Sequence, residues 1–530
     1  MLNSNKMKLR SNIIKLLALG LFATPIAFTS CSEDAMDAVN VNPNNPTDVT
    51  SKFILADVIT STAFNNVGSD INTYLAAYVE HEVGTYNQLW DAEHRVSQPA
   101  LSSTFNNPWG SIYEAIRNAK IAIAKCSEGG VEAGNNTTLG VAQVLNAYNL
   151  ALLTDMFGDV PYSEAFDPYG NKNPKIDKQE DLYKEVFSLL DQAIENLPKG
   201  DKSPIGGIGT NDLLYNGKAA NWLQLAYGLK ARYEMRLLNV STDKNAALNK
   251  VIEYVDKSFQ AVSDEAAFNV YDSQNLNPLF NFQWSRDGLA ASKSIAEKLV
   301  DRNDPRLRRN FTNPDWVQVA NLAPNSKADS LLAPNGENEQ IQYYYLTSTF
   351  VYAQTASTEL LSYHELLFLK AEAMQRLGAS ASEIESVLKQ AVKAGIHNSE
   401  KSVAAAFVAP TVVEYGGITE TTKPITDEEI DTYFDKSVKP LLQANALKEI
   451  ANQKYLAFFG ASGESVEMYN DIRRWKAEGK DLIVLKNPNK FPLRLPYGNS
   501  ETSANPNVQA AFGNGQYVYT ENVWWAGGSR

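Results

Sequence analysis

Thr154-Asp155-Met156-Phe157-Gly158-Asp159-Val160-Pro161-Tyr162-Ser163-Glu164-Ala165 is the most informative stretch of this 530-residue chain. Glycine is common just after the last turn of a helix, because it adopts the left-handed backbone conformation without steric cost. Proline cannot continue a helix and fixes the turn that follows. The stretch therefore predicts a helix that ends at Gly158 and passes into a loop held by Pro161.

Further segments have the apolar spacing of amphipathic helices, in which every third or fourth residue faces the core. They are 181–197 with Leu182, Val186, Leu189, Leu190, Ala193 and Leu197; 222–237 with Trp222, Ala226, Leu229, Tyr233 and Leu237; and 360–374 with Leu360, His364, Leu367, Ala371 and Met374. Short connections favour antiparallel helix pairs. Small residues such as Gly228 and Ala373 permit close approach, as in tetratricopeptide repeats, although no fixed repeat period is present. The pattern alone predicts a degenerate helical-repeat scaffold.

Long irregular insertions separate the predicted helices, and several of them are rich in aromatic residues. They cover residues 84–108, 158–179, 200–217, 264–290, 303–356 and 396–425. Loops of this length on a compact domain are usually functional or disordered, and the aromatic content argues against disorder. We expect the functional residues to lie in these insertions.

The first 50 residues have the pattern of an exported lipoprotein. A basic start is followed by an apolar run from Ile13 to Phe28, which is too short and interrupted to span a bilayer. Small residues precede Cys31, which is typical of a lipobox with a lipid-modified cysteine; the alternative is an ordinary signal peptide with an incidental cysteine. We predict a signal peptide at 1–30, an extended leash at 31–50 and a single domain at 51–530.

Charge and cysteine content narrow the class of protein. The net charge of −13 argues against nucleic-acid partners, whose affinity comes largely from Lys and Arg. With Cys31 lipid-modified, Cys126 remains alone, so no intramolecular disulfide is expected. Cys126 follows a predicted helix, which favours a packed thiol.

No motif for catalysis, metal binding or a cofactor is evident. His81-Glu82 and His364-Glu365 begin like a zinc-protease helix, but the second histidine is absent in both. His364 lies on an apolar helical face, which favours a hydrogen-bonded core residue. The glycine-rich segments match neither a dinucleotide loop nor a P-loop. The sequence neither supports nor excludes a pair of carboxylates for glycoside hydrolysis, because 61 acidic residues make chance pairs inevitable.

Several motifs in a fixed order resemble the SusD/RagB family of outer-membrane lipoproteins. They are Cys31, residues 42–47, residues 154–165, Asp304-Pro305-Arg306, the helix from Glu365 to Gly378 with Ala371-Glu372-Ala373, Gln453-Lys454, Asp471-Ile472-Arg473-Arg474 and residues 492–497. At Tyr469-Asn470 the chain departs from the many relatives that carry a tryptophan nearby. Asp471, Arg473 and Arg474 are expected to tie helix ends and loops together rather than to contact a ligand.

The resemblance implies one mainly α-helical domain, with a tetratricopeptide-like scaffold of helical pairs and a loop-rich part that binds the ligand. It also implies a nutrient-binding protein that is not an enzyme. Such a protein is anchored by lipid to the outer membrane, faces the exterior and delivers an oligosaccharide or peptide to a TonB-dependent transporter of the SusC type. No cofactor is implied.

Candidate ligand-binding residues follow from chemistry, because aromatic planes pack on sugar rings while amides and carboxylates bond their hydroxyls. The candidates are Tyr86, Asn87, Trp90 and Asp91 in one loop, Gln283 and Trp284 in a second, and Tyr344 in a third. Residues 343–345 also suit a short strand with one buried face. Trp524 and Trp525 are expected to pin the C-terminal tail.

Two alternative functions remain open at this stage. One is a surface glycoside hydrolase or peptidase, which would show turnover dependent on one Asp or Glu. The other is a transporter lid with little affinity of its own for a ligand. The residues do not identify the ligand, because one fold serves many sites.

Overall fold

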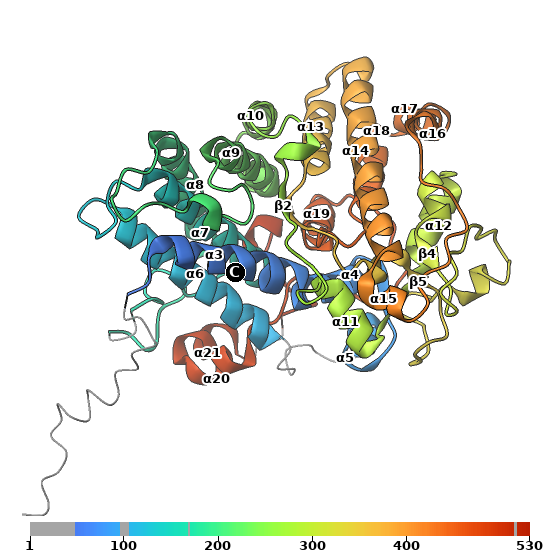
Figure 1. The fold of residues 1–530 in the computed structure, drawn as a ribbon, viewed down its shortest axis with the longest axis horizontal. Coiled ribbons are helices and arrows are strands. Elements are labelled where there is room, and N and C mark those ends of the chain that lie inside the picture. The colour runs from blue at the N-terminus through green and yellow to red at the C-terminus, as the bar shows by residue number, and fades with distance from the viewer. Residues whose placement is uncertain (1–47, 96–104, 168–169, 514–516) are drawn as a thin grey trace, which may run out of the picture. The chain divides into compact units, whose positions relative to one another are not determined.

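The computed structural model describes residues 48–95, 105–167, 170–513 and 517–530. Thr50–Arg530 forms one compact unit, and helices make up most of it (Figure 1). The predicted signal peptide at 1–30, the lipidation site Cys31 and nearly all of the leash at 31–50 lie outside the described residues. None of the helices that the structure describes combines the length and apolarity needed to cross a membrane.

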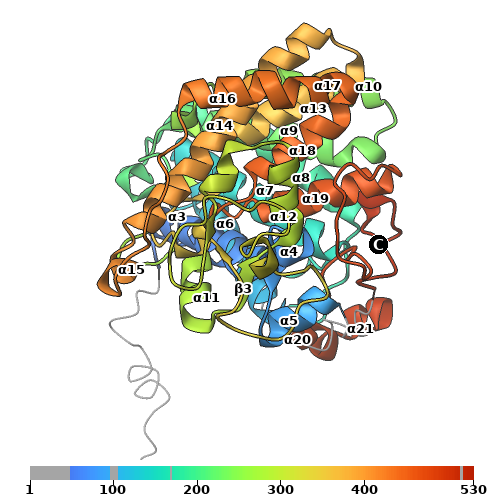
Figure 2. The same ribbon diagram turned by 90° about the vertical axis from the view of Figure 1, so that its right-hand side faces the viewer.

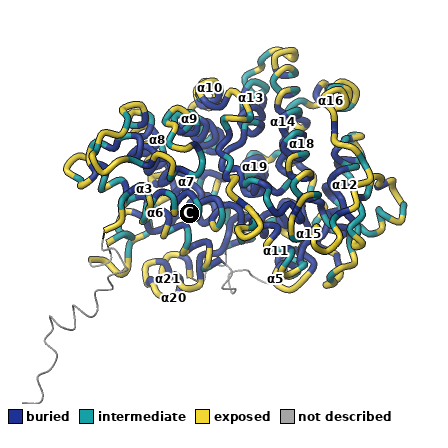
Figure 3. Tube along the Cα trace, viewed as in Figure 1, coloured by how far each residue is buried: buried dark blue, intermediate teal, exposed yellow. Residues whose placement is uncertain are grey.

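The first part of the scaffold is built around one buried helix. α7 (Asn136–Phe157) is buried at every residue but its first, and it packs against α6 (Asn106–Cys126) on one side and α8 (Gln179–Asn196) on the other (Figure 3). α3 (Ser51–Ser61) crosses α6 and continues through a π-helical turn (Thr62–Gly68) toward α4 (Asp70–Tyr78). As predicted, α7 ends at Gly158, whose φ is 81°.

The second part consists of further helices packed in succession. α9 (Ala219–Arg236) pairs with α10 (Lys244–Asp256), α10 contacts α13 (Tyr363–Leu377), and α13 pairs with α14 (Ala381–Phe407). α18 (Ala446–Ala457) packs on both α13 and α14, and α19 (Ser465–Ala477) contacts α4 and α9. These helical pairs confirm the predicted scaffold.

Hydrogen bonds at the ends of α13 and α14 explain where these helices begin and end. The side chain of Ser362 accepts the backbone N–H of Glu365, and α13 ends at Gly378 in the left-handed conformation. Ser380 and Glu383 then form a capping box that starts α14. The prediction that the helix already includes Leu360 was wrong, because Leu360 lies in β6 (Thr358–Leu361) and Ser362 sets the start of the helix.

The loop-rich part contains short strands and short helices. Among the described residues, three antiparallel pairs occur: β1 (Glu82–Gly84) with β3 (Leu289–Ala291), β2 (Ala266–Phe268) with β6, and β4 (Phe311–Thr312) with β5 (Thr347–Ser348). The helices are α5 (Asn87–His94), α11 (Pro278–Arg286), α12 (Lys293–Asp301), α15 (Pro410–Glu414), α16 (Asp427–Tyr433), α17 (Lys439–Ala444), α20 (Asn499–Ala504) and α21 (Pro506–Phe512).

Three predictions about the insertions were wrong. The candidates Asn87, Trp90, Asp91, Gln283 and Trp284 do not lie in irregular loops, because α5 and α11 cover them. The insertion predicted to begin at residue 396 begins later, because α14 continues to Phe407 with Ile396 and Val403 buried on its inner face. Residues 343–345 do not form a strand; they are a series of bends, and β5 begins only at Thr347. Tyr343 has a φ of 57°, which is incompatible with extended backbone.

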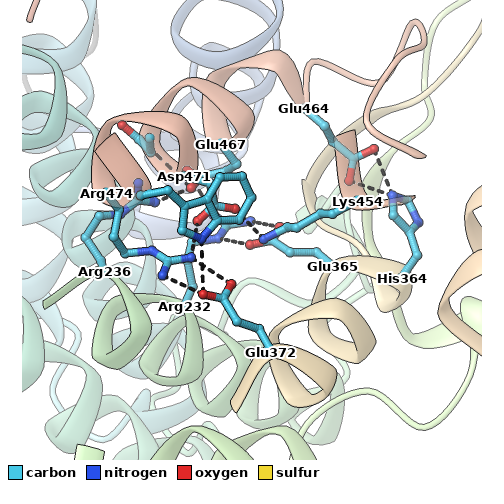
Figure 4. Close-up of polar contacts among 12 residues, drawn as sticks. Arg232, Arg236, His364, Glu365, Glu372, Lys454, Glu464, Glu467, Asp471 and Arg474 are labelled. Atoms are coloured by element: carbon cyan, nitrogen blue, oxygen red, sulfur yellow. Dashed lines mark hydrogen bonds and ion pairs between the residues drawn. The ribbon is translucent and has the colours of Figure 1, made fainter. Parts of the chain in front are cut away.

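A buried network of ion pairs joins α9, α13, α18 and α19 (Figure 4). Arg474 on α19 donates two hydrogen bonds, of 2.8 and 2.9 Å, to the carboxylate of Glu372 on α13. Arg232 on α9 makes a similar two-point contact with Glu365 at 2.7 and 2.6 Å. Lys454 on α18 contacts Asp471 at 2.6 Å. Opposite charges buried together in this way fix how the helices sit against one another.

The network confirms the structural role predicted for Asp471, Arg473 and Arg474. Arg473 donates to the backbone oxygens of Asp155 and Leu493, at 2.7 and 3.1 Å, and so joins α19 to the end of α7 and to the C-terminal segment. Trp525 is fully buried, and the Arg473 guanidinium lies 4.8 Å from the centroid of the Trp525 ring, as expected for a residue that pins the C-terminal tail.

His364 and Cys126 are core residues, as predicted. His364 is fully buried, and its Nε2 lies 2.8 Å from a carboxylate oxygen of Glu464. The thiol of Cys126 is buried at the end of α6, 3.5 Å from the Ser51 hydroxyl. Burial raises the pKa of this thiol to about 11, which keeps it protonated and unreactive at neutral pH.

Candidate ligand-binding site

The loop-rich part holds a cavity of about 370 Å³ whose wall is largely aromatic. Its wall comes from segments far apart in sequence that meet around α11 and the end of α15, which lie beside each other in Figures 1 and 2. The lining residues are Thr85, Gln283, Trp284, Asp287, Leu289, Ala290, Pro314, Trp316, Ile341, Tyr343, Tyr345, Thr347, Tyr352 and Tyr415. We call it the aromatic cavity.

Trp284 is the centre of the aromatic wall. Its ring stacks on Phe280, one turn earlier in α11, with 5.6 Å between the centroids and 14° between the planes. Trp316 and Tyr415 approach the same ring, with centroids 5.9 and 5.5 Å away. Tyr352 continues the group at 5.9 Å from Trp316. Phe280 is buried and holds Trp284 in place, so the exposed part of the indole is positioned before any ligand arrives.

Two tyrosines at the cavity are unusually exposed for aromatic residues. Tyr343 is 78% exposed and Tyr415 is 71% exposed. Exposed aromatic rings around a concave site commonly mark a binding surface, since their apolar area is otherwise left in water. The wall therefore combines fixed rings inside with accessible rings at the edge.

Part of the cavity wall has strained backbone. Of the nine described residues other than glycine with a positive φ, three line the cavity: Asp287 at 44°, Trp316 at 58° and Tyr343 at 57°. Such conformations cost roughly 1–3 kcal/mol each and persist mainly where the surroundings enforce them, often at ligand sites. The strain is consistent with a wall shaped for binding.

Few polar groups face the aromatic wall, and one of them is a carboxylate without a full set of partners. The buried amide of Gln283 donates to Asp287 at 2.6 Å and accepts from the backbone N–H of Leu289 at 3.0 Å. Within the described residues, the second carboxylate oxygen of Asp287 is buried without a hydrogen-bond partner. Partial burial raises the pKa of Asp287 to about 6. The Asp287 carboxylate lines the cavity, and its oxygens can only accept hydrogen bonds while it is ionised.

The sequence candidates divide between the cavity and its surroundings. Gln283 and Trp284 line the aromatic cavity, and Tyr344 is half-exposed next to the lining residues Tyr343 and Tyr345. Tyr86, Asn87 and Asp91 are exposed at α5, outside this wall. Trp90 also lies outside it: its indole N–H donates to the Asn338 oxygen at 3.0 Å, and its ring packs on His94.

Trp316, Tyr352 and Tyr415 are cavity residues that were not among the sequence candidates. Trp316 follows Asn313-Pro314-Asp315, and Tyr415 precedes Gly416-Gly417. An aromatic residue next to a strong turn signal is the one local clue that both share. In the part of the chain that the structure describes, no three His, Cys, Asp or Glu side chains are grouped to hold a metal ion.

The small sheet beside the cavity contains a carboxyl group that should make the stability of the fold depend on pH between 4.5 and about 8. Glu82 in β1 is buried and accepts a hydrogen bond from Ser348; burial raises its pKa from 4.5 to about 8. The folded protein therefore keeps a proton that the unfolded chain releases, so this group lowers stability as pH rises from 4.5 to about 8. Glu82→Gln imitates the protonated form, so its free energy of unfolding should depend less on pH. At pH 8 this change should favour the variant by on the order of a few kcal/mol.

Denaturant unfolding at pH 6 and pH 8 measures this effect. Glu128→Gln, the same change at an exposed position, serves as the control and should leave the pH dependence as it is. Equal loss of stability in the Glu82→Gln variant and the original protein between these pH values would show that Glu82 is ionised in the fold.

Comparison with known proteins places the chain in a family. Residues 43–475 match the SusD-like family model described as starch-binding and associating with the outer membrane. The chain is 51% identical to a SusD/RagB family protein from Bacteroides thetaiotaomicron, with a TM-score of 0.85 over 91% of this chain and 100% of that one. No match is found among curated proteins.

More distant structures share the fold. A chitin-binding protein is 22% identical, with a TM-score of 0.66 over 89% of this chain and 99% of that one. A chitin-binding SusD homologue from Flavobacterium johnsoniae is 18% identical, with a TM-score of 0.64 over 90% of this chain and 98% of that one. With a family model over most of its length and a relative of the same family at 51% identity, the chain belongs to the SusD/RagB family of outer-membrane-associated binding proteins.

Proposed function

We propose that this protein captures an oligosaccharide in the aromatic cavity and delivers it, unaltered, to a TonB-dependent transporter of the SusC type. The observation that carries the proposal is the group formed by Trp284, Trp316 and Tyr415 around one concave site. Sugar rings present apolar C–H faces, which pack on aromatic planes, and hydroxyls at their edges, which need polar partners. The family description names starch, and two structural relatives are named for chitin.

Each part of the wall has a role in this proposal. Trp284 is the platform for one sugar ring, because Phe280 already fixes its orientation. The Asp287 carboxylate, oriented by Gln283, accepts hydrogen bonds from ring hydroxyls. Tyr343, Tyr344 and Tyr415 cover the ligand from the edge. Rigid aromatic residues lose little conformational entropy on binding, so their contacts contribute efficiently to affinity.

The proposal includes a lipid anchor on Cys31 that holds the protein at the exterior face of the outer membrane. A lipid chain contributes about 0.8 kcal/mol per buried CH₂, and stable anchoring takes more than one chain, which a triacylated cysteine provides. Cys31→Ala should therefore move the protein from the membrane to the soluble fraction, as measured by fractionation and immunoblotting. Equal retention of the Cys31→Ala variant would contradict the anchor.

A binding screen of the mature chain, residues 32–530, tests the function. Oligosaccharides of the starch and chitin series and a set of peptides are titrated by calorimetry, and each mixture is then analysed for products. Binding of an oligosaccharide without cleavage is the expected result. Product formation that disappears when one Asp or Glu is neutralised would make the protein an enzyme. No binding to any ligand, with copurification of the transporter, would favour a lid.

A further inference from the structure

A second cavity, of about 420 Å³, lies on the other side of α11 from the aromatic cavity. Its lining residues are Phe64, Ser69, Asp70, Tyr74, Gln88, Asn106, Asn107, Pro278, Asn281, Phe282, Ser285 and Arg286. They come from the π-helical turn, α4, α5, the start of α6 and α11. We call it the amide cavity, because side-chain amides are its commonest polar groups.

The chemistry of the amide cavity suits the hydroxyl groups of a neutral carbohydrate. Asn107 hydrogen-bonds the carboxyl group of Asp70, and the Arg286 guanidinium faces the same carboxyl. Arg286 also lies over the ring of Phe282, 5.8 Å from its centroid. The side chains of Asn107, Asn281 and Arg286 are exposed to solvent, so a ligand can reach them. Amides, a carboxyl and a guanidinium beside aromatic rings are the groups that bind sugars.

Consecutive residues connect the two cavities. On α11, Gln283 and Trp284 line the aromatic cavity, while Phe282 and Ser285 line the amide cavity. At the C-terminal end of the helix, Arg286 belongs to the amide cavity and Asp287, the next residue, to the aromatic cavity. The helix is thus a shared wall.

A second segment runs along the same boundary. Thr85 lines the aromatic cavity and Gln88 lines the amide cavity, with the exposed Tyr86 and Asn87 between them. This segment is fastened to the end of α11, because the N–H of Thr85 donates to the Gly288 oxygen at 2.9 Å. We call the exposed residues Tyr86 and Asn87, which connect the two lining residues along the chain, the ridge; both are sequence candidates for ligand contact.

The width of the shared wall limits what can bind both cavities at once. An α-helix with its side chains is about 10–12 Å across. A monosaccharide fits within one cavity but cannot span this width. A chain of several sugars that passes over the end of α11 can contact Trp284 on one side, Tyr86 and Asn87 on the ridge, and Asn281 and Arg286 on the other side.

We infer that the aromatic and amide cavities are the two ends of one extended surface, which binds an oligosaccharide several units long across the C-terminal end of α11. The role of the aromatic cavity in this inference rests on the proposed function. The inference adds the amide cavity as a second contact site, and it adds the length of the ligand. Trp284 provides a contact that short and long chains share. Asn281 and Arg286 contact only chains long enough to cross the ridge.

Chain-length dependence of affinity tests the inference with the full mature chain. The ligands are maltotriose and maltoheptaose, and the trimer and heptamer of the chitin series, each measured by calorimetry. The Asn281→Ala/Arg286→Ala variant removes the exposed polar groups of the amide cavity. Asn249→Ala/Lys250→Ala, on the exposed face of α10, removes an amide and a cation elsewhere and is the matched control. Melting temperatures confirm that each variant folds.

In the series that binds, the heptamer should bind at least about tenfold more tightly than the trimer. Asn281→Ala/Arg286→Ala should remove that advantage and leave the affinity for the trimer unchanged, whereas Trp284→Ala should weaken the binding of both ligands.

Equal affinities for trimer and heptamer, or a heptamer advantage that survives the Asn281→Ala/Arg286→Ala variant, would overturn the inference and leave the proposed function standing. Binding of the heptamer that depends on Arg286 but not on Trp284 would instead contradict the proposed role of the aromatic cavity. No binding of either series would contradict both.

Discussion

Replacement of Glu372 by alanine is expected to lower the free energy of unfolding by about 3–5 kcal/mol, as is typical when one partner of a buried ion pair is removed. Glu372 is buried and accepts hydrogen bonds from Arg474 at 2.8 and 2.9 Å and from the Trp475 indole at 3.1 Å. Arg376 contacts the same carboxylate at 2.8 Å. Without Glu372, the fully buried Arg474 loses its two-point partner on α13.

The pH dependence of this loss provides an internal check. Burial alone would raise the pKa of Glu372, but the guanidinium groups of Arg474 and Arg376 lower it well below the ordinary value of 4.5. A lowered pKa means that the ion pairs stabilise the fold above about pH 4.5 and cease to do so as pH falls through the folded-state value. The difference in stability between the original protein and Glu372→Ala should therefore shrink in acid.

Denaturant unfolding followed by circular dichroism measures both effects. Glu253→Ala is the matched control, because Glu253 pairs with Lys257 on the exposed surface of α10, where water screens the charges. It should change stability little. A loss for Glu372→Ala no larger than that for Glu253→Ala would show that the buried network does not hold the helices together.

Replacement of Trp284 by alanine is the second large effect, on affinity rather than stability. The affinity for the bound oligosaccharide should fall by about tenfold to a hundredfold, since a central aromatic anchor often contributes 2 kcal/mol or more. Loss of the ring removes the sugar platform and also the surface on which Trp316 and Tyr415 pack. Some stability should be lost as well, because Trp284 is half-buried on Phe280.

Trp90→Ala is the matched control for this change. Trp90 is also half-buried, but its ring packs on His94 and its indole N–H is already bonded to Asn338. We expect it to lower the melting temperature and leave the affinity unchanged, as calorimetry and thermal unfolding will show. Equal losses of affinity in the two variants would mean that the aromatic cavity is not the specific site.

The helical scaffold could be predicted from the sequence because its signals are local. Segment 181–197 corresponds to α8 and segment 222–237 to α9, each within a few residues. The glycines at 158 and 378 mark helix ends through their own backbone preference. Leu360 was placed in the wrong element because a strand and a helix meet at Ser362, and apolar residues on both sides keep a helical spacing.

The cavity could be predicted only in part, because its wall depends on tertiary structure. Gln283 and Trp284 stood out as an amide beside an aromatic residue in one loop. Trp316 and Tyr415 come from separate insertions, which are joined by backbone hydrogen bonds between Thr419 and residues 316 and 318 and which meet at Trp284 only in the folded chain. Trp90, like Trp284, has an aromatic residue, an amide and a carboxylate nearby in sequence, and only its contacts with Asn338 and His94 distinguish it.

A crystal structure of the mature protein soaked with its tightest-binding oligosaccharide would show where the ligand binds. We expect a sugar ring stacked on the Trp284 indole, with hydroxyls within hydrogen-bond distance of Asp287, and an intact glycosidic bond. A sugar bound elsewhere with the aromatic cavity empty, or cleaved within it, would mean that this cavity does not capture the ligand for delivery.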